Sequence, residues 1–452
     1  MSRNQQTDEV VASLDAPQSG SHLNRRSFLI GTTALFASVP LVTSLDACAG
    51  SAGSSAGSSG GTVNFQTSAG VRFGIPNKAL IAEYQKTQSK VQVNMTVMPV
   101  QNYFPKLSTE IASKMSDLDI FTTITNLLYP AAQAGNIVAL EDVIPKDILA
   151  DLVADIPSHY LDTWRWKGKL YALPNDSNAQ WSFYRTDLFE QAGVTLPKTW
   201  DDAPAAAKAL TKDGVYGYAA SLRRGEYAGA HFSSTFFSNG GEWYDPDFNP
   251  TINSDAGTRA IEVMLALMPY ADPSSINAGE DDTAQVLASG TAAWAPLEWG
   301  RSDLTDPKRT PLAPKIGTSV PPDGTKPASP CLGGQAYAIA SWSKKQKEAL
   351  DYIIYATSSK AMRTFVGNAG QPARSSALTD SANVKIDPYF PTLQKVLAQG
   401  HPFPPIPESY PMLVELGNHV ADILTKSVSP RQGLQSANDA FAKMLKQGSY
   451  LK

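Results

Sequence analysis

The sequence predicts an α/β protein with a largely parallel sheet, and two observations lead to this fold class. Strand-like and helix-like segments alternate along the chain after its first 61 residues, which is typical of a sheet covered by helices. Of the 452 residues, 42% are hydrophobic, which is enough to build a large core. At about 100–200 residues per domain, the length predicts two or three domains.

The first elements follow from their periodicity. Apolar and polar residues alternate over residues 91–97, which predicts a half-buried strand. Tyr103, Leu107 and Ile111 recur every fourth residue, which predicts an amphipathic helix. Residues 118–121 then predict a short second strand. This strand–helix–strand order is the pattern expected of a parallel sheet.

Later segments are interpreted in the same way. Residues 335–339 predict a strand, and residues 347–356 predict a helix with its apolar side chains on one side. The end of the chain, from Leu413 onward, also has helical spacing. Residues 308–330 are rich in Pro and Gly, so we expect irregular structure there.

Residues 1–47 predict an export signal. Arg25 and Arg26 precede the uncharged stretch 28–45, which is the layout of a secretory signal and resembles a twin-arginine signal. The alternative is that this stretch remains as a transmembrane helix, although it is short for a span. Under either interpretation, the rest of the chain lies outside the cytoplasm.

A membrane anchor is expected directly after the signal. Residues 45–48 resemble a bacterial lipobox, which implies that Cys48 is lipidated and holds the protein at the cell membrane. Residues 48–61 are almost entirely Gly, Ser and Ala, so we expect a flexible tether with no capacity to pack.

Composition and missing motifs exclude several classes of function. The net charge of −4 argues against a nucleic-acid-binding protein. Two cysteines rule out a disulfide scaffold. The five histidines form no recognisable metal spacing, and the chain has neither a P-loop nor a dinucleotide fingerprint. We therefore expect no metal, no cofactor and no catalytic residues.

A series of ordered motifs carries a family resemblance. The motifs are GKLYALP (168–174), SFYRTDLFEQAG (182–193), PKTWDD (197–202), FSNGGEW (237–243), LGGQAYAI (332–339) and GQPARS (370–375). The chain resembles the extracytoplasmic solute-binding proteins of ABC transporters, in the maltose-binding-protein-like group that binds sugars and polyols. The resemblance implies a monomer that delivers its ligand to the permease subunits of an importer.

The resemblance implies a two-lobed periplasmic-binding-protein fold of type II, with α/β lobes joined by a multi-strand hinge. Ligand would bind in the cleft, which closes by a hinge motion. The implied boundaries are 62–178 and 299–342 for lobe 1, and 179–298 and 343–452 for lobe 2.

The candidate ligand-binding residues combine this resemblance with the chemistry of sugars. Aromatic faces suit polarised C–H groups, and planar polar side chains pair with hydroxyls. Glu298 and Trp299 are the strongest pair, while glycines such as Gly333 let the backbone approach a ligand. The alternative is that the tryptophans only fill the core. The full set is Tyr103, Asp119, Thr122, Asn178, Trp181, Arg224, Trp243, Glu298, Trp299, Gly333, Gly334, Gln335 and Arg374.

Two other functions remain open. The chain could be an exported carbohydrate-active enzyme that uses paired carboxylates such as Glu298 and Asp119. It could also bind a non-sugar solute, such as an oligopeptide, a phosphate ester or a metal chelate.

Overall fold

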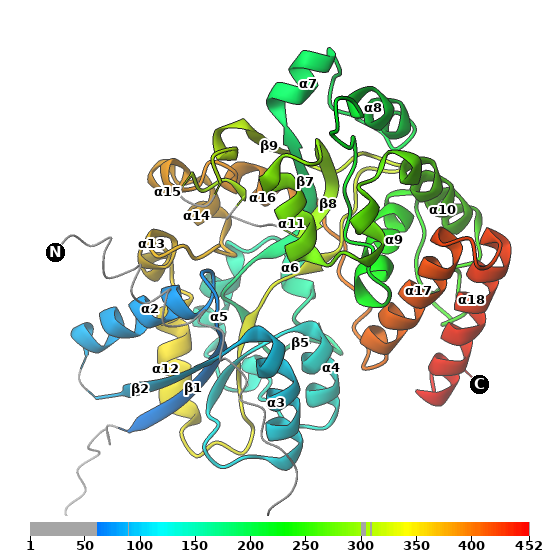
Figure 1. The fold of residues 1–452 in the computed structure, drawn as a ribbon. Helices are drawn as coiled ribbons and strands as arrows, with labels where there is room; N and C mark the ends of the chain where they lie inside the picture. Colours follow the sequence, from blue (N-terminus) through cyan, green and yellow to red (C-terminus); the bar gives the residue numbers. More distant parts are fainter. Residues whose placement is uncertain (1–60, 89, 300–303, 308–309, 452) are drawn as a thin grey trace, which may run out of the picture. The chain divides into compact units, whose positions relative to one another are not determined.

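The computed structural model describes residues 61–451, except 89, 300–303 and 308–309 (Figure 1). The expected signal, the lipidation site Cys48 and all but the last residue of the expected tether lie outside the described residues. No helix in the described part of the chain is both long and apolar enough to span a membrane.

A five-stranded sheet contains the first strands of the described chain and one much later strand. Its order is β2-β1-β3-β11-β6. The strands are β1 (Thr62–Ser68), β2 (Gln92–Met98), β3 (Ile120–Thr123), β6 (Leu173–Pro174) and β11 (Ala336–Ile339). β1 runs parallel to β2 and β3, whereas β11 is antiparallel to β3 and β6. The carboxyl ends of β1 and β3 therefore meet at one edge of the sheet.

Helices follow each of the first three strands, as the alternating sequence predicts. They are α2 (Gly74–Thr87), α3 (Val100–Ser113) and α4 (Thr125–Gln133), with η1 (Leu140–Asp142), α5 (Lys146–Ala154), α6 (Ser158–Asp162) and the hairpin β4 (Arg165–Trp166) and β5 (Lys169–Leu170) further on. Tyr103, Leu107 and Ile111 of α3 are all buried, which confirms the four-residue spacing as the core-facing side of this helix.

A second, four-stranded sheet is built around β7. Its strands are β7 (Asn178–Arg185), β8 (Trp294–Trp299), β9 (Ile316–Ser319) and β10 (Leu332–Gly333), and the last three all pair antiparallel with β7. Between β7 and β8 the chain forms α7 (Thr186–Ala192), α8 (Ala203–Leu210), α9 (Glu226–Ser238), α10 (Asp255–Leu267), η2 (Met268–Tyr270), η3 (Pro273–Asn277) and α11 (Glu280–Ser289), and η5 (Ala313–Lys315) precedes β9.

The last part of the described chain is helical, as its spacing predicts. Its helices are α12 (Gln346–Ala356), α13 (Ser359–Gly367), α14 (Ser375–Thr379), α15 (Ser381–Ile386), α16 (Phe390–Gln399), α17 (Ser409–Leu424) and α18 (Pro430–Gln447). α12 and α13 pack against α2, whereas α17 packs against α9 and α18 (Figure 1). The helical segment is thus divided between two groups of elements.

Two hydrophobic cores correspond to this division. One contains the buried side chains of the first sheet and of α2, α3, α12, α13 and α16. The other contains those of α8, α9, α10, α17 and α18. The segment 343–452 was expected in lobe 2, but its first helices belong to the first core because the apolar side of α12 faces β11 and α2. The boundaries expected at residues 62, 178 and 298 stay a prediction.

The expectation of irregular structure over residues 308–330 is wrong in one place. β9 lies in this segment and pairs with β7, so part of the range 299–342 joins the second sheet rather than the first. Gly317 of β9 lies against the ring of Tyr184, where a Cβ would approach Cζ to 2.6 Å. Gly317 is one of the glycines that led to the prediction of irregular structure, but it is needed here for close packing within a strand.

Candidate functional site

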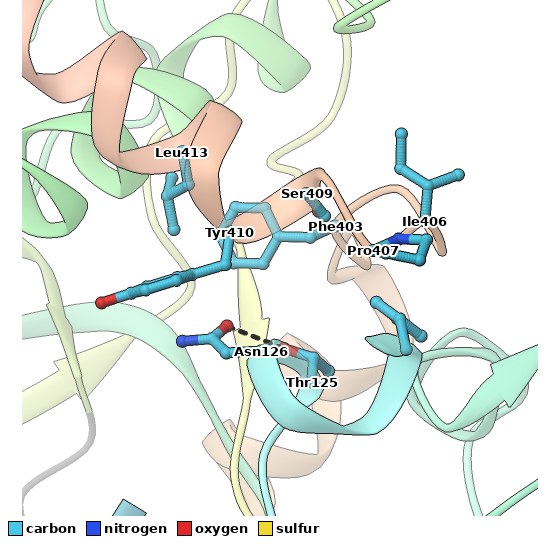
Figure 2. A pocket seen from close by; sticks show the side chains of 9 residues that line it. Thr125, Asn126, Phe403, Ile406, Pro407, Ser409, Tyr410 and Leu413 are labelled. Carbon is cyan, nitrogen blue, oxygen red and sulfur yellow. Dashed lines mark hydrogen bonds between the residues drawn. The ribbon is translucent and has the colours of Figure 1, made fainter. Parts of the chain in front are cut away.

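A pocket opens between the start of α4 and the segment that leads into α17 (Figure 2). The open space between these elements is about 230 Å³ when the solvent at its mouth is included, and it forms a shallow recess rather than an enclosed cavity. Its lining residues are Thr125, Asn126, Tyr129, Phe403, Ile406, Pro407, Ser409, Tyr410 and Leu413. None of these side chains carries a charge at neutral pH, and the polar groups of the α4 side face a largely apolar and aromatic wall.

The position of the pocket follows from the sheet. α4 starts two residues after β3 ends, so Thr125 and Asn126 lie at the carboxyl end of a central strand. Ligands of open α/β sheets bind at this edge, because the loops there leave a crevice lined by backbone and short polar side chains. Thr125 Oγ1 lies 3.4 Å from Asn126 Oδ1, which turns the Asn126 amide nitrogen away from Thr125 (Figure 2).

Tyr410 forms the aromatic wall of the pocket. Its ring lies above Asn126 in Figure 2, and its hydroxyl donates to Glu226 Oε2 at 3.0 Å. Burial, together with the neighbouring Glu226 carboxylate, raises the pKa of Tyr410 to about 12. The phenol therefore stays protonated at neutral pH. Tyr129 is different, because its buried hydroxyl donates to the backbone oxygen of Thr163 at 2.8 Å and only its ring adjoins the pocket.

A close helix crossing brings Tyr410 and Glu226 together, although they lie 184 residues apart. α9 and α17 contact each other through glycines, which have no side chain to keep the backbones apart. A Cβ added at Gly417 would lie 1.7 Å from the oxygen of Gly225, and one added at Gly229 would lie 2.3 Å from the oxygen of Leu413. Only small residues permit this approach.

Four of the residues predicted from the sequence lie together where β7 meets β8 and β10. Gly333 pairs with Asn178, and Trp299 pairs with Gln180 on the other side of β7. The ring of Trp299 lies against Gly333, where a Cβ would approach Cζ3 to 2.8 Å. Gly334 has a φ of 108°, a conformation that favours glycine, and it adjoins the backbone oxygen of Asp176. Their role in ligand binding stays a prediction.

The other predicted tryptophans lie in the cores. Trp181 is 1% exposed and packs edge-on against Phe183 and Tyr389. Trp243 is also 1% exposed, and its indole nitrogen donates to Ser233 Oγ at 3.1 Å. Both rings pack in the cores, and their role in ligand binding stays a prediction.

Tyr103, Asp119 and Thr122 are bound to neighbouring elements of the first sheet. Asp119 accepts from the backbone nitrogen of Asn64 at 2.9 Å and from Ser343 Oγ at 2.5 Å. The Tyr103 hydroxyl lies 2.7 Å from the backbone oxygen of Thr122 and is fully buried. These contacts tie strands and helices together.

The remaining predicted residues are also engaged within the protein. Gln335 donates to Ser68 Oγ at 2.9 Å, and Glu298 is fully buried and accepts from Ser221 Oγ at 3.2 Å. Arg224 forms an ion pair with Asp422, and Arg374 forms one with Asp155 at 3.1 Å. Neither arginine lines the pocket described above.

A buried ion pair at the carboxyl end of β1 was not anticipated. Arg72 Nη2 lies 2.9 Å from Asp176 Oδ2, and the Asp176 side chain is fully buried. Burial raises the pKa of Asp176 to about 6, although Arg72 opposes the rise. Asp387, whose charge also interacts with Arg72, has its pKa raised by burial to about 7. No local motif signals this cluster, because its members come from three distant segments.

Two chemical properties limit what the chain can do. Among the described residues, no group of three or more His, Cys, Asp or Glu side chains is arranged to hold a metal ion. Cys331 is buried, and burial raises its thiol pKa to about 12, so it remains an unreactive thiol at neutral pH.

The amino-acid sequence is similar to those of two transport-related binding proteins. A probable amino-acid ABC transporter periplasmic-binding protein of Sinorhizobium fredii is 27% identical over 322 residues, which cover 68% of this chain and 73% of that protein. A mannitol-binding protein of Pseudomonas aeruginosa is 26% identical over 397 residues, covering 82% of this chain and 90% of that protein.

Solved structures share the fold. The structure of an ABC transporter solute-binding protein from Agrobacterium radiobacter in complex with ribitol has a TM-score of 0.74 and 25% identity, covering 85% of this chain and 98% of that chain. A solute-binding protein from Agrobacterium vitis with bound D-mannitol has a TM-score of 0.72 and 23% identity, covering 86% of this chain and all of that chain. These matches confirm the expected two-lobed periplasmic-binding-protein fold. The family model for bacterial extracellular solute-binding proteins matches residues 76–363, more than half of the sequence, and the chain therefore belongs to that family.

Proposed function

We propose that the chain is the extracytoplasmic binding protein of an ABC importer and that it captures a sugar or sugar alcohol between α4 and α17. The uncharged pocket carries this proposal, because its lining combines the amide of Asn126, the hydroxyls of Thr125, Ser409 and Tyr410, and an aromatic face. Hydroxyls of a ligand need such donors and acceptors, since a buried polar group without a partner costs about 1–3 kcal/mol. The C–H groups of a sugar suit the face of Tyr410.

Two relatives support this class of ligand. One is named a mannitol-binding protein, and the structure from A. radiobacter contains ribitol. Another relative is named for amino-acid transport, which makes amino acids the principal alternative ligand. An amino acid carries two charges that need partners when they are buried, and the pocket lining offers none.

Capture would depend on the two walls of the pocket. Leu128 and Tyr129 of α4 belong to the first core, whereas Leu413 and Leu416 of α17 belong to the second. A ligand that contacts both walls stabilises the arrangement in which they face each other, and this closed form is then presented to the permease. Binding and release need no covalent step, so no catalytic residue is required.

The proposal also covers the cellular location of the protein and its membrane anchor, which depend on the N-terminal residues. Members of this family work outside the cytoplasm, which agrees with the export signal expected over residues 1–47. Lipidation of Cys48 would hold the protein at the membrane, and the tether of residues 48–61 would let it reach a permease. A monomer suffices for this role.

A thermal-shift screen of the purified chain tests the ligand class. The panel contains aldoses, alditols, disaccharides, amino acids and inorganic anions. A ligand at 100 times its Kd stabilises the folded form by about 2.7 kcal/mol, which gives a measurable rise in melting temperature. We expect a sugar or alditol to raise it and to be recovered unchanged. A response to amino acids alone would overturn the proposal, and a cleaved sugar would indicate an enzyme.

A further inference from the structure

The edge of the first sheet where its parallel strands begin gathers segments that are distant in the sequence. β1 and β2 run parallel, with Thr62 opposite Gln92, so both strands start at this edge. α2 and α3 each connect the end of one strand to the start of the next, so both helices end there. β11 runs antiparallel to β3 and also ends there, and residues 341–347 follow it. The pocket lies at the opposite edge of the sheet.

Hydrogen bonds join these segments into one surface. The indole nitrogen of Trp342 donates to the backbone oxygen of Met115, just after α3, at 2.7 Å. The ammonium group of Lys345 donates to the backbone oxygen of Thr62 at the start of β1. We call this surface the base, and it is formed by residues 86–88, 90–92, 114–117 and 341–347.

The base is rich in lysine, although the net charge of the chain is −4. Within the residues that define the base, Asp117 is the one carboxylate. The lysines of the base are Lys86, Lys90, Lys114, Lys344, Lys345 and Lys347, and all except Lys345 are exposed. Because each lysine adds to the same positive potential, the base favours an anionic partner.

Apolar groups lie among these lysines. Met115 is 40% exposed, and Trp342 is partly exposed beside it. Tryptophan is typical of surfaces that meet a membrane, because its amphipathic ring suits the level of the lipid headgroups. Lysine suits the same place, since its aliphatic stem can lie along apolar surface while its ammonium group stays in water. A small soluble anion would use only the charges, whereas a lipid surface would use both kinds of group.

The folded part of the chain is joined to the N-terminal residues at the base. Residue 61 directly precedes β1, so the expected tether reaches the fold beside Lys345. An extended chain from Cys48 to Thr62 spans at most about 50 Å. With the proposed lipid anchor at Cys48, the base therefore has the shortest chain path to the bilayer.

We propose that the base is a membrane-contacting surface that binds anionic phospholipid headgroups through its lysines, with Trp342 and Met115 entering the headgroup region. This inference goes beyond the proposed function, since it concerns neither the solute nor the pocket. Contact at the base would hold the folded chain close to the bilayer and leave the opposite edge of the sheet, where the pocket lies, accessible to solutes.

A charge reversal tests this contact, and α18 supplies a matched control. Lys344→Glu/Lys347→Glu changes two exposed lysines at the start of α12, where a carboxylate is compatible with the helix N-terminus. Lys443→Glu/Lys446→Glu makes the same change, with the same spacing, at exposed positions of α18. Residues 61–452 form a compact unit that contains both cores, so they are used without the N-terminal residues.

Binding is measured by cosedimentation with vesicles of equimolar phosphatidylglycerol and phosphatidylcholine, or of phosphatidylcholine alone. Each lysine near an anionic surface strengthens binding about fivefold, so Lys344→Glu/Lys347→Glu should weaken binding to the anionic vesicles by about 25-fold or more. The α18 control should change it by less than about twofold, because charges beyond a Debye length of about 10 Å are largely screened. Melting temperatures report whether each variant is folded.

A fluorescence measurement locates the contact independently of charge. Brominated phospholipid in the anionic vesicles should quench the tryptophan fluorescence of the unchanged protein, and Trp342→Phe should remove this quenching. Quenching that persists in Trp342→Phe would mean that another face meets the lipid and would overturn the proposal.

Three binding results would also overturn it. Equal losses in the two charge-reversed proteins would show that the base has no special role. Equal binding to both kinds of vesicle would show that anionic headgroups are not recognised. Binding that requires added permease subunits would assign the base to a protein partner. Each of these results leaves the proposed function intact, because solute binding is measured separately and without lipid.

Discussion

Replacing Gly417 with alanine tests whether the crossing of α9 and α17 positions the pocket. A Cβ at this residue would lie 1.7 Å from the oxygen of Gly225 and 2.7 Å from the nitrogen of Gly229, so the two helices must separate. Where a helical glycine has open space around it, replacing it with alanine stabilises the folded protein by up to about 1 kcal/mol, because alanine has the higher helix propensity. Overpacking in a rigid core costs about 1–3 kcal/mol, and the clash here is with backbone that cannot rotate away.

We therefore expect Gly417→Ala to lower the free energy of unfolding, measured by denaturant titration, and to weaken ligand binding because Tyr410 moves away from Glu226. Gly367→Ala is the matched control, since Gly367 ends α13 and nothing lies within 4 Å of its added Cβ. The control should be neutral or slightly stabilising. A Gly417→Ala protein as stable as the control, with unchanged Kd, would show that the close crossing of α9 and α17 does not position the pocket.

Three further predictions address single side chains. Tyr410→Ala should weaken ligand binding by about 1–3 kcal/mol, measured by calorimetry, because a stacking face and a hydrogen-bonding oxygen are both lost; an unchanged Kd would contradict this. Asp119→Ala should destabilise folding by about 1–3 kcal/mol by leaving Asn64 and Ser343 without their acceptor, with Kd unchanged, whereas a large loss of binding would restore Asp119 as a ligand residue. Asp387 has a folded-state pKa of about 7 against an ordinary value of 3.8, so its contribution to stability is full below the ordinary value and is lost as pH rises through about 7. The melting temperature of the wild-type protein should therefore fall relative to Asp387→Asn between these pH values, and parallel curves would contradict the assignment.

Local periodicity predicted the elements whose environment is set by nearby residues. The spacing of Tyr103, Leu107 and Ile111 predicted α3 because an amphipathic helix shows its buried side directly in the sequence. β9 was missed because it has only four residues and contains Gly317. A glycine is required at this position because the ring of Tyr184, from a distant strand, packs against its backbone. Such a contact leaves no periodic signal.

The pocket proposed as the ligand site was not among the residues predicted from the sequence, and the predicted ligand residues stay a prediction. Reasoning from the carboxyl ends of parallel strands led to Asp119 and Thr122, which lie just before β3 and within it. The pocket is lined by Thr125 and Asn126, which begin α4 two residues after β3 ends. The strand boundary was the missing information, and the polar pair Thr125 and Asn126 at the start of α4 was the signal available. Tyr410 had no such signal, because its partner is 184 residues away.

The predicted tryptophans show a different limit. Large aromatic side chains suit both sugar faces and protein cores, and residue type alone does not distinguish the two. Trp181 and Trp243 are buried, whereas Trp299 is partly exposed beside Gly333. Exposure depends on which elements cover a strand, and this is decided by tertiary packing.

The location of the ligand is tested most directly by a crystal structure of the chain with the best ligand from the screen. We expect a sugar or alditol between α4 and α17, with a hydroxyl within hydrogen-bond distance of both Asn126 Nδ2 and the Tyr410 oxygen. A ligand bound elsewhere, such as on Trp299 and Gly333 without contact to Tyr410, would contradict it.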